Sequence, residues 1–571
     1  MSNMDKTKQT NLQNLEIGKE VFAHLSEICE DPMKHNEALL MQMLEMNKDT
    51  EFGKKMGFAD MHSIEDFQRK MPITTYDDYV EYILRMTENG ENGLFFAEDI
   101  HHYNRTSGTT GTPKRIPMSD QALETFVQYT EYCHLGVIES TIGPDFTNGR
   151  HIRLMEATDK EQYLPCGATF GAISQKQSRS MRSKLPDIFT APDEALYPRG
   201  DTNTRYLHAR YALMDKGAVC LHGTFFSFLL EQMRYIEKEW KMLCHDIETG
   251  TIDASIRMPE DVRAKLENEL KPMPERAAEL RAIFEEGFET PIMKRLWPEM
   301  RFVIGIASGS FAAQYKMMNE RYIGDDGIRL LKFGIAASEG LFTVAYAMDR
   351  DDTVIIPDSV FYEFLPLEAD DDFSQIVTLD KVEEGKEYEL IVTNTSGLCR
   401  YRMKDIVRIA GKFKNTPTLT YSTRRDHLVS IMGEKTSEQA LTAAIQNTAD
   451  ELGFTLVDYS VYPDMNSVPV RYQYFVEVEN VPSELNPKII REVLEKYIAE
   501  ANPSMGQKVK SKVCGDTRLN FLEPETYLLY KDMMIAKGTA STQVKPVHII
   551  SNERQRKFFF GMTEYSAEVM R

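Results

Sequence analysis

The chain has 571 residues, 42% of them hydrophobic and 27% charged, and its formal net charge is −21. This length is too great for one hydrophobic core, so we expect a large domain and a smaller one. The negative charge argues against a nucleic-acid partner, because contacts to phosphates need clustered Lys and Arg side chains.

The cysteines and the apolar segments bear on the cellular compartment. The seven cysteines are widely scattered and form no C-x-x-C pair, so neither a zinc site nor a disulfide framework is expected. The first sixteen residues are polar, and no window of 18 apolar residues occurs. We therefore expect a cytoplasmic protein with no membrane partner.

The N-terminal part of the chain is predicted to be helical. Apolar residues recur at helical spacing over residues 11–70, and Pro72 then ends the last helix. The stretch from Tyr103 to Pro117 follows, and its residues 107–112 are four hydroxyl residues interleaved with two glycines, directly before Pro113 and Lys114. Such a loop suits a polyphosphate, because its backbone N–H groups can converge on an anion, although a surface turn has the same composition.

Alternating helices and strands are predicted after this loop. Ser119 is a plausible cap for a helix whose positive dipole end points back toward the loop. Residues 206–240 indicate two helices around a short strand, and residues 246–290 are charged and helical. Two buried-strand runs are predicted, one that starts at Phe302 and ends in Ser308-Gly309-Ser310, and one that starts at Leu330 and ends in residues 337–340. Each end either binds a ligand, as the carboxyl ends of strands do in an α/β sheet, or is an ordinary exit from a strand.

A pair of strands is predicted over residues 387–411, turning between Asn394 and Gly397. The second strand carries several charges, which either face solvent on an edge strand or have partners. Asp405 is the exception, because a carboxylate between apolar residues needs a designated partner if it is buried. A fresh α/β unit starts near Gly433, with a capping box at 436–439 and a helix stop at Gly453.

These segments occur in the order expected of the adenylate-forming superfamily, and within it the chain most resembles the Gretchen Hagen family of acyl acid amido synthetases. The resemblance covers almost the whole chain. It is carried by an ordered set of phrases at residues 47–54, 71–79, 103–117, 308–312, 337–339, 401–405 and 543–546. It implies an α/β fold with a large N-terminal adenylate-forming domain over 1–425 and a smaller mobile α/β domain over 426–571.

The resemblance also implies ATP and Mg²⁺ as cofactors and assigns roles to individual residues. Ser107 to Gly111 would wrap the ATP phosphates, Asp405 would bind the ribose hydroxyls and Glu339 would help to hold Mg²⁺. Lys435 and Lys545 would be catalytic together with Glu339, and residues 424–426 would form the hinge. The nucleotide-binding set implied in this way is Ser107, Gly108, Thr109, Thr110, Gly111, Lys114, Ser310, Ala336, Ala337, Ser338, Asp405 and Arg424.

The chain departs from the family pattern in two places. The third motif usually reads Tyr-Arg-Val-Gly-Asp, whereas Met403 and Lys404 precede Asp405 here, so a lysine replaces a glycine. The second motif has Phe333-Gly334-Ile335-Ala336 and lacks its common Tyr. The first departure leaves the local loop geometry open, and the second removes a phenol contact.

Three functions are weighed. The first is an ATP-dependent ligase that activates a small carboxylic acid as an acyl-adenylate and transfers it to an amino acid. The alternative is an acyl-CoA ligase, which the family-like segment around Lys545 disfavours. A promoter-binding regulator is disfavoured by the net charge of −21. We expect small carboxylic acid and amino acid partners and a monomer or weak dimer.

Overall fold

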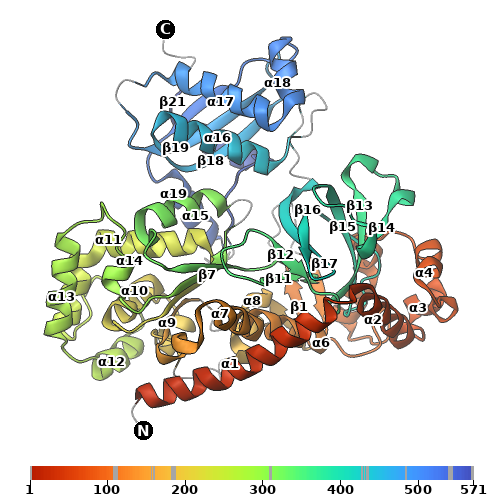
Figure 1. The fold of residues 1–571 in the computed structure, drawn as a ribbon, viewed down its shortest axis with the longest axis horizontal. Helices are drawn as coiled ribbons and strands as arrows, with labels where there is room; N and C mark the ends of the chain where they lie inside the picture. Colours follow the sequence, from red (N-terminus) through yellow and green to blue (C-terminus); the bar gives the residue numbers. More distant parts are fainter. Residues whose placement is uncertain are drawn as a thin grey trace. The chain divides into compact units, whose positions relative to one another are not determined.

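The computed structural model describes residues 3–106, 114–155, 157, 161–181, 188–307, 311–425, 429, 431, 436–482, 485–537 and 544–566 (Figure 1). The chain divides into two compact units. The first comprises residues 1–306 and 318–420, and the second comprises residues 307–317 and 421–571. Among the described residues, no helix is long and apolar enough to cross a membrane.

The first unit begins with helices, as predicted, and they pack on a large apolar core through residues such as Leu40, Phe52 and Phe67. Pro72 lies just after the end of the fourth helix, α4. Their bounds are α1 (Asn3–Ile28), α2 (Pro32–Asn47), α3 (Glu51–Met56), α4 (Ile64–Lys70) and α5 (Val80–Asn89).

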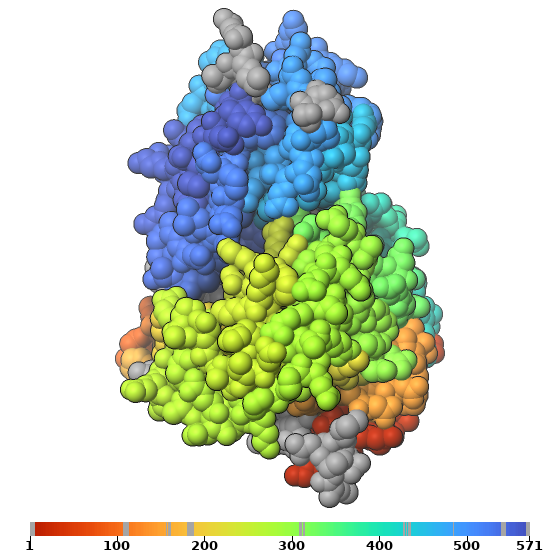
Figure 2. Space-filling model, turned by 90° about the vertical axis from the view of Figure 1, so that its left-hand side faces the viewer, coloured from red at the N-terminus to blue at the C-terminus, as the bar shows by residue number. Residues whose placement is uncertain are grey.

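A parallel sheet of order β3-β6-β7-β8 lies at the centre of the next region. Its strands are β3 (His151–Leu154), β6 (Cys220–Phe225), β7 (Phe302–Ile306) and β8 (Arg329–Lys332). Two helices, α6 (Asp120–Val127) and α7 (His134–Ile142), precede β3 in the chain. Because parallel strands need crossovers, helices connect β3 to β6 and β6 to β7: α8 (Ile173–Met181), α9 (Asp193–Leu196) and α10 (Thr204–Met214), then α11 (Phe226–Thr249), α12 (Glu260–Glu269), α13 (Pro274–Glu285) and α14 (Met293–Leu296). Helices α11 to α14 cover one side of this region, and in Figure 2 their yellow to green side chains form a continuous surface.

Two further sheets carry the segments that the sequence singles out. The first has the order β2-β1-β5-β4 and contains β1 (His102–Arg105), β2 (Arg115–Met118), β4 (Gln162–Tyr163) and β5 (Thr169–Gly171). The second has the order β11-β12-β17-β16-β15-β13-β14, with β11 (Thr343–Val344), β12 (Thr353–Ile355), β13 (Val360–Pro366), β14 (Val377–Thr378), β15 (Glu387–Asn394), β16 (Tyr401–Phe413) and β17 (Thr416–Arg424). A short hairpin, β9 (Ala336–Ala337) and β10 (Gly340–Leu341), stands between them in the sequence order.

The second unit is a four-stranded sheet with helices and its own apolar core. The strands are β18 (Thr455–Asp464), β19 (Arg471–Glu479), β20 (Arg518–Leu522) and β21 (Thr563–Ser566), and the helices are α15 (Ala312–Met318), α16 (Glu438–Leu452), α17 (Pro487–Ala501), α18 (Pro503–Lys510), α19 (Thr526–Ala536) and α20 (Glu553–Gly561). The predicted helix stop at Gly453 is confirmed by its left-handed backbone. The cap of α16 is Ser437, whose side chain accepts from the N–H of Ala440.

Candidate active site

The stem of the predicted phosphate loop is the antiparallel pair β1 and β2, in which Arg105 pairs with Arg115. One residue beyond the strands, the Lys114 N–H donates a 3.1 Å hydrogen bond to the Thr106 hydroxyl. The exposed Lys114 ammonium lies 5.1 Å from the centre of the Tyr76 ring. The predicted phosphate-binding residues Ser107 to Gly111 lie outside the described residues.

The segment with Ala336, Ala337, Ser338 and Glu339 is a tight hairpin. Ala337 pairs with Gly340, so Ser338 and Glu339 form the turn between β9 and β10. Gly334 leads into this hairpin, and a Cβ atom there would lie 1.7 Å from the Thr343 carbonyl oxygen. Only glycine therefore permits this approach of the two backbones.

Two buried asparagines hold the turn of this hairpin. The Asn104 side chain, on β1, donates a 2.7 Å hydrogen bond to the Ser338 carbonyl. The Asn394 side chain, at the end of β15, donates a 2.7 Å hydrogen bond to the Glu339 carbonyl. Both asparagines are almost completely buried, and the two hydrogen bonds are themselves partly buried, so they are partly shielded from water.

A turn after Asn394 connects this arrangement to helix α6. The side-chain oxygen of Asn394 accepts from the N–H groups of Ser396 and Leu398 at 3.1 and 3.0 Å. The Ser396 hydroxyl in turn accepts a 3.0 Å hydrogen bond from the N–H of Ser119. Ser119 caps α6 as predicted, since its hydroxyl accepts from the N–H of Ala122. The stem of the predicted loop, the hairpin and the β15–β16 turn are thus brought together.

Asp405 lies in a bulge of β16. Glu389 pairs with Ile406 and Ile391 pairs with Arg402, so a single β15 residue faces the three residues from Met403 to Asp405. Lys404 has a φ of 62°, the left-handed conformation that glycine adopts most easily. The lysine therefore keeps the backbone shape that a glycine would favour, and the bulge turns a half-buried Asp405 out of the regular alternation.

The arginines at the start of β16 do not lie on a solvated edge strand, so that interpretation of the charges is wrong. β16 lies between β15 and β17 in the interior of its sheet. Arg400 is buried and makes two hydrogen bonds of 2.9 Å to Glu363, and its guanidinium also donates to the Met71 carbonyl at 2.7 Å. Arg402 pairs with the buried Glu389. These arginines tie β16 to its neighbours because a buried carboxylate requires a partner.

The other candidates belong to the second unit or to undescribed segments. Arg424 is exposed at the end of β17, and Lys545 is exposed in an irregular segment before α20. Ser310 and Lys435 lie outside the described residues, as does Asp426 of the expected hinge.

Comparison with known proteins gives three matches along the chain. The N-terminal domain of the GH3 family matches residues 21–328, its central domain matches residues 353–424 and its C-terminal domain matches residues 439–554. The chain belongs to the GH3 family. The first of these matches alone spans more than half of the chain, and the hairpin around Ser338 lies between the first and the second.

Relatives of known name support this membership. The indole-3-acetic acid-amido synthetase GH3.3 of Arabidopsis thaliana is 26% identical over 533 residues, covering 90% of this chain and 88% of that protein. The jasmonoyl–L-amino acid synthetase GH3.5 of Oryza sativa subsp. japonica is 25% identical, covering 93% and 95% of the two chains. A solved structure of the GH3.15 acyl acid amido synthetase has the same fold, with a TM-score of 0.83, 23% identity and coverage of 95% and 96%.

Burial shifts the pKa values of two side chains beside the loop stem of this GH3 protein. Burial lowers the pKa of His102, on β1, to about 4, with the nearby Lys176 acting in the same direction. His102 is therefore a neutral residue at pH 7, and its Nδ1 lies 2.7 Å from the Thr169 hydroxyl. Burial also raises the pKa of the Tyr76 phenol, which accepts a 3.0 Å hydrogen bond from the N–H of Arg115.

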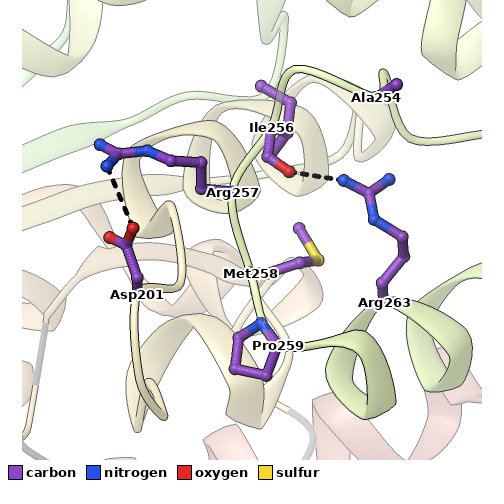
Figure 3. Close-up of a pocket in the computed structure, with 7 residues that line it drawn as sticks. All are labelled: Asp201, Ala254, Ile256, Arg257, Met258, Pro259 and Arg263. Carbon is purple, nitrogen blue, oxygen red and sulfur yellow. Dashed lines mark hydrogen bonds and ion pairs between the residues drawn. The ribbon is translucent and has the colours of Figure 1, made fainter.

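Two cavities of the first unit are lined by other residues. One pocket is lined by Asp201 and residues 254–263, where Arg257 pairs with Asp201 at 3.0 Å and Arg263 donates to the Ile256 carbonyl (Figure 3). A larger cavity of about 1170 Å³ lies beside β3, where Arg153 pairs with Glu131. Neither cavity is lined by a predicted site residue that the structure describes.

Sequence reasoning missed the residues that hold the site together. Asn104 and Asn394 lie within the segments that the sequence singles out, but no motif assigns them a role. The available signal was an amide side chain within or at the end of a strand next to a glycine-rich turn, where backbone carbonyls need donors. Gly334 belongs to the second motif, but the reason for a glycine there is its close approach to the Thr343 carbonyl, which only the folded structure shows.

Proposed function

We propose that this GH3 protein is an ATP-dependent acyl acid amido synthetase. A carboxylate oxygen of the acid attacks the α-phosphorus of ATP, which forms the acyl-adenylate and releases pyrophosphate. The amine of an amino acid then attacks the acyl carbon, the amide bond forms, and AMP leaves with the bonding electrons while the amine loses a proton. Both steps gain most from fixed donors and cations at the phosphates, in a site that excludes water.

The nucleotide would be bound where the three segments meet. Ser107 to Gly111 and Lys114 would contact the phosphates, and Ala336 to Ser338 would line the adenine and α-phosphate. Asp405 would accept hydrogen bonds from the ribose hydroxyls. This proposal is supported by the two asparagine contacts, which fix the hairpin turn relative to the stem of the loop.

Mg²⁺ is proposed as the metal cofactor. Among the described residues, no group of three or more His, Cys, Asp or Glu side chains is placed to hold a metal. Mg²⁺ does not require such a group, because it binds through one or two carboxylates together with substrate phosphates. Glu339 would supply the carboxylate, and the ion would neutralise charge on the phosphates.

The named relatives and the cysteines bear on the amino acid acceptor and on the compartment. One relative is named an indole-3-acetic acid-amido synthetase and another a jasmonoyl–L-amino acid synthetase, and these names support an amino acid acceptor here. None of the seven cysteines, all in the described part of the chain, is in a disulfide, and six are buried, which supports the cytoplasm as a reducing compartment. We also infer that the second unit reorients between the two steps around residues 424–426, and that Lys545 serves the adenylation step.

The observation that carries the proposal is the match to all three GH3 domains, in order, along this chain. The test is carboxylate-dependent exchange of pyrophosphate into ATP, with a panel of aromatic and aliphatic acids. Active acids are then offered amino acids or CoA as the acceptor. Formation of an amide confirms the proposal, whereas a thioester as the sole product would favour the acyl-CoA ligase, and a folded protein that gives no exchange would refute adenylation.

A further inference from the structure

His548 is buried in the second unit between two carboxylates from different elements. Its Nδ1 lies 2.9 Å from a carboxylate oxygen of Glu438, the first residue of α16. Its Nε2 lies 2.8 Å from a carboxylate oxygen of Asp458, on β18. The imidazole side chain is 0% exposed, so both contacts are protected from solvent.

The two contacts define the protonation state of the ring. An ionised carboxylate only accepts hydrogen bonds, so the ring must donate from both nitrogens and is an imidazolium. Burial opposes this charge, but Asp458 and Glu438 outweigh it and raise the pKa of His548 to about 10. The Tyr459 ring stacks on the imidazolium with 4.3 Å between ring centres, and Tyr527 also lies close to Asp458.

Each of the two carboxylates has a further stabilising interaction. Asp458 accepts a 3.0 Å hydrogen bond from the side chain of Gln314 on α15, and a 2.9 Å bond from the N–H of Tyr459. Glu438 stands at the N-terminus of α16, where the positive end of the helix dipole favours a negative charge.

The backbone around His548 is fastened to β18. The N–H of Val461 donates to the His548 carbonyl at 2.7 Å, and the N–H of Ile550 donates to the Val461 carbonyl at 2.9 Å. The Ser460 hydroxyl also donates to the Val547 carbonyl. Lys545 lies three residues before His548, and Pro546 between them restricts the chain.

We propose that His548 is a positioning residue, which ties the segment carrying Lys545 to α16 and β18 at once and thereby sets where the lysine can reach. The proposal rests on the proposed function, since it concerns the lysine assigned to adenylation. Without the imidazolium, Glu438 and Asp458 would be buried carboxylates that lack their cationic partner, and the segment would lose its side-chain contacts to α16 and β18.

The test uses the full chain with His548→Gln, which is neutral and cannot donate to both carboxylates through a charged ring. The matched control is Thr448→Ala, which removes a buried hydroxyl that bonds within α16 and lies outside the lysine segment. Each variant is assayed for pyrophosphate exchange and, separately, for amide formation from a chemically supplied acyl-adenylate. Hydrogen exchange is measured in peptides containing Val461 and Ile550.

We expect His548→Gln to lower the exchange rate at least tenfold, to change amide formation from the adenylate by less than threefold, and to speed hydrogen exchange at Val461 and Ile550. Thr448→Ala should leave the ratio of the two half-reactions unchanged. Equal loss of both half-reactions, or unchanged adenylation, would overturn the proposal.

Two further arms keep the outcome decisive. If His548→Gln does not fold, Glu438→Gln removes one carboxylate charge and should speed the same hydrogen exchange, and unaltered exchange there would overturn the proposal. If the wild-type protein shows no pyrophosphate exchange with any acid, the proposed function fails. Hydrogen exchange still decides in that case, because faster exchange supports the tie and unchanged exchange overturns it.

Discussion

The side-chain amide of Asn104 donates a 2.7 Å hydrogen bond to the main-chain carbonyl of Ser338, which lies 234 residues further along the chain. The contact fixes a turn of the β9–β10 hairpin to the strand that leads into the predicted phosphate loop. Asn394 makes the equivalent contact to the next carbonyl, that of Glu339. The two amides therefore set the position of the turn that is proposed to meet the nucleotide.

Asn104→Ala is expected to weaken ATP use. Removal of the donor leaves the Ser338 carbonyl without this partner, which costs about 1–3 kcal/mol for a buried group. We expect KM for ATP to rise about 5- to 150-fold in the pyrophosphate exchange assay. The control is Asn36→Ala, because Asn36 also bonds two buried carbonyls, of Pro357 and Val360, away from the hairpin. Asn36→Ala should lower the melting temperature with little effect on KM, and equal KM values for the two variants would contradict the assignment.

Asp405→Asn tests the proposed ribose contact. An amide cannot replace a carboxylate that accepts from two hydroxyls, and a hydrogen bond to a charged group contributes about 1.5–3 kcal/mol. KM for ATP should therefore rise roughly 10- to 150-fold. Asp326→Asn, at an exposed position in the same unit, serves as the control. A KM that stays at the wild-type value in a folded Asp405→Asn protein would remove Asp405 from the site.

Lys404 is expected to tolerate glycine but not a β-branched residue. Its φ of 62° costs a side-chain-bearing residue roughly 1–2 kcal/mol, and a glycine avoids that cost while losing more entropy on folding. Lys404→Gly should leave the free energy of unfolding within about 1 kcal/mol of wild type, whereas Lys404→Ile should lower it by more. Chemical denaturation measures both, with the exposed Lys412→Ile on the same strand as a control. Equal stability of the two Ile variants would show that the bulge imposes no strain.

The elements were predictable where a local pattern decides them. Local signals act over a few residues, and the structure confirms the helix ends that they predict: Pro72 after α4, the Ser119 cap of α6 and Gly453 after α16. The fold class followed from the resemblance and is confirmed by the solved GH3.15 structure.

The contacts that assemble the site could not be predicted in the same way. Asn104 and Ser338, or Gly334 and Thr343, meet only after the sheets have formed, so no spacing in the sequence indicates them. The charges at the start of β16 had two interpretations, because their partners lie on other strands. Arg400 pairs with Glu363 on β13, and Arg402 pairs with Glu389 on β15. The position of a strand within its sheet is a tertiary property, and it decided between them.

The buried His548 predicts a specific dependence of stability on pH. Its pKa in the folded protein is raised to about 10 from an ordinary value of 6.5. Below pH 6.5 both the folded and the unfolded chain hold the proton, so the stabilisation is complete. Between pH 6.5 and 10 unfolding releases the proton, and the free energy of unfolding therefore falls as pH rises.

The measurement compares wild type with His548→Gln, which has no titrating group at this position. The difference in free energy of unfolding between them should be constant below about pH 6.5 and should shrink steadily toward pH 10. Titrating groups outside the His548–Glu438–Asp458 cluster act in both proteins, so their effects largely cancel in the difference. Thr448→Ala, compared with wild type in the same way, should give a difference that does not change with pH. A wild-type advantage over His548→Gln that stays constant or grows across this range would mean that His548 is neutral in the folded protein, and that its two carboxylate partners do not hold it as a cation.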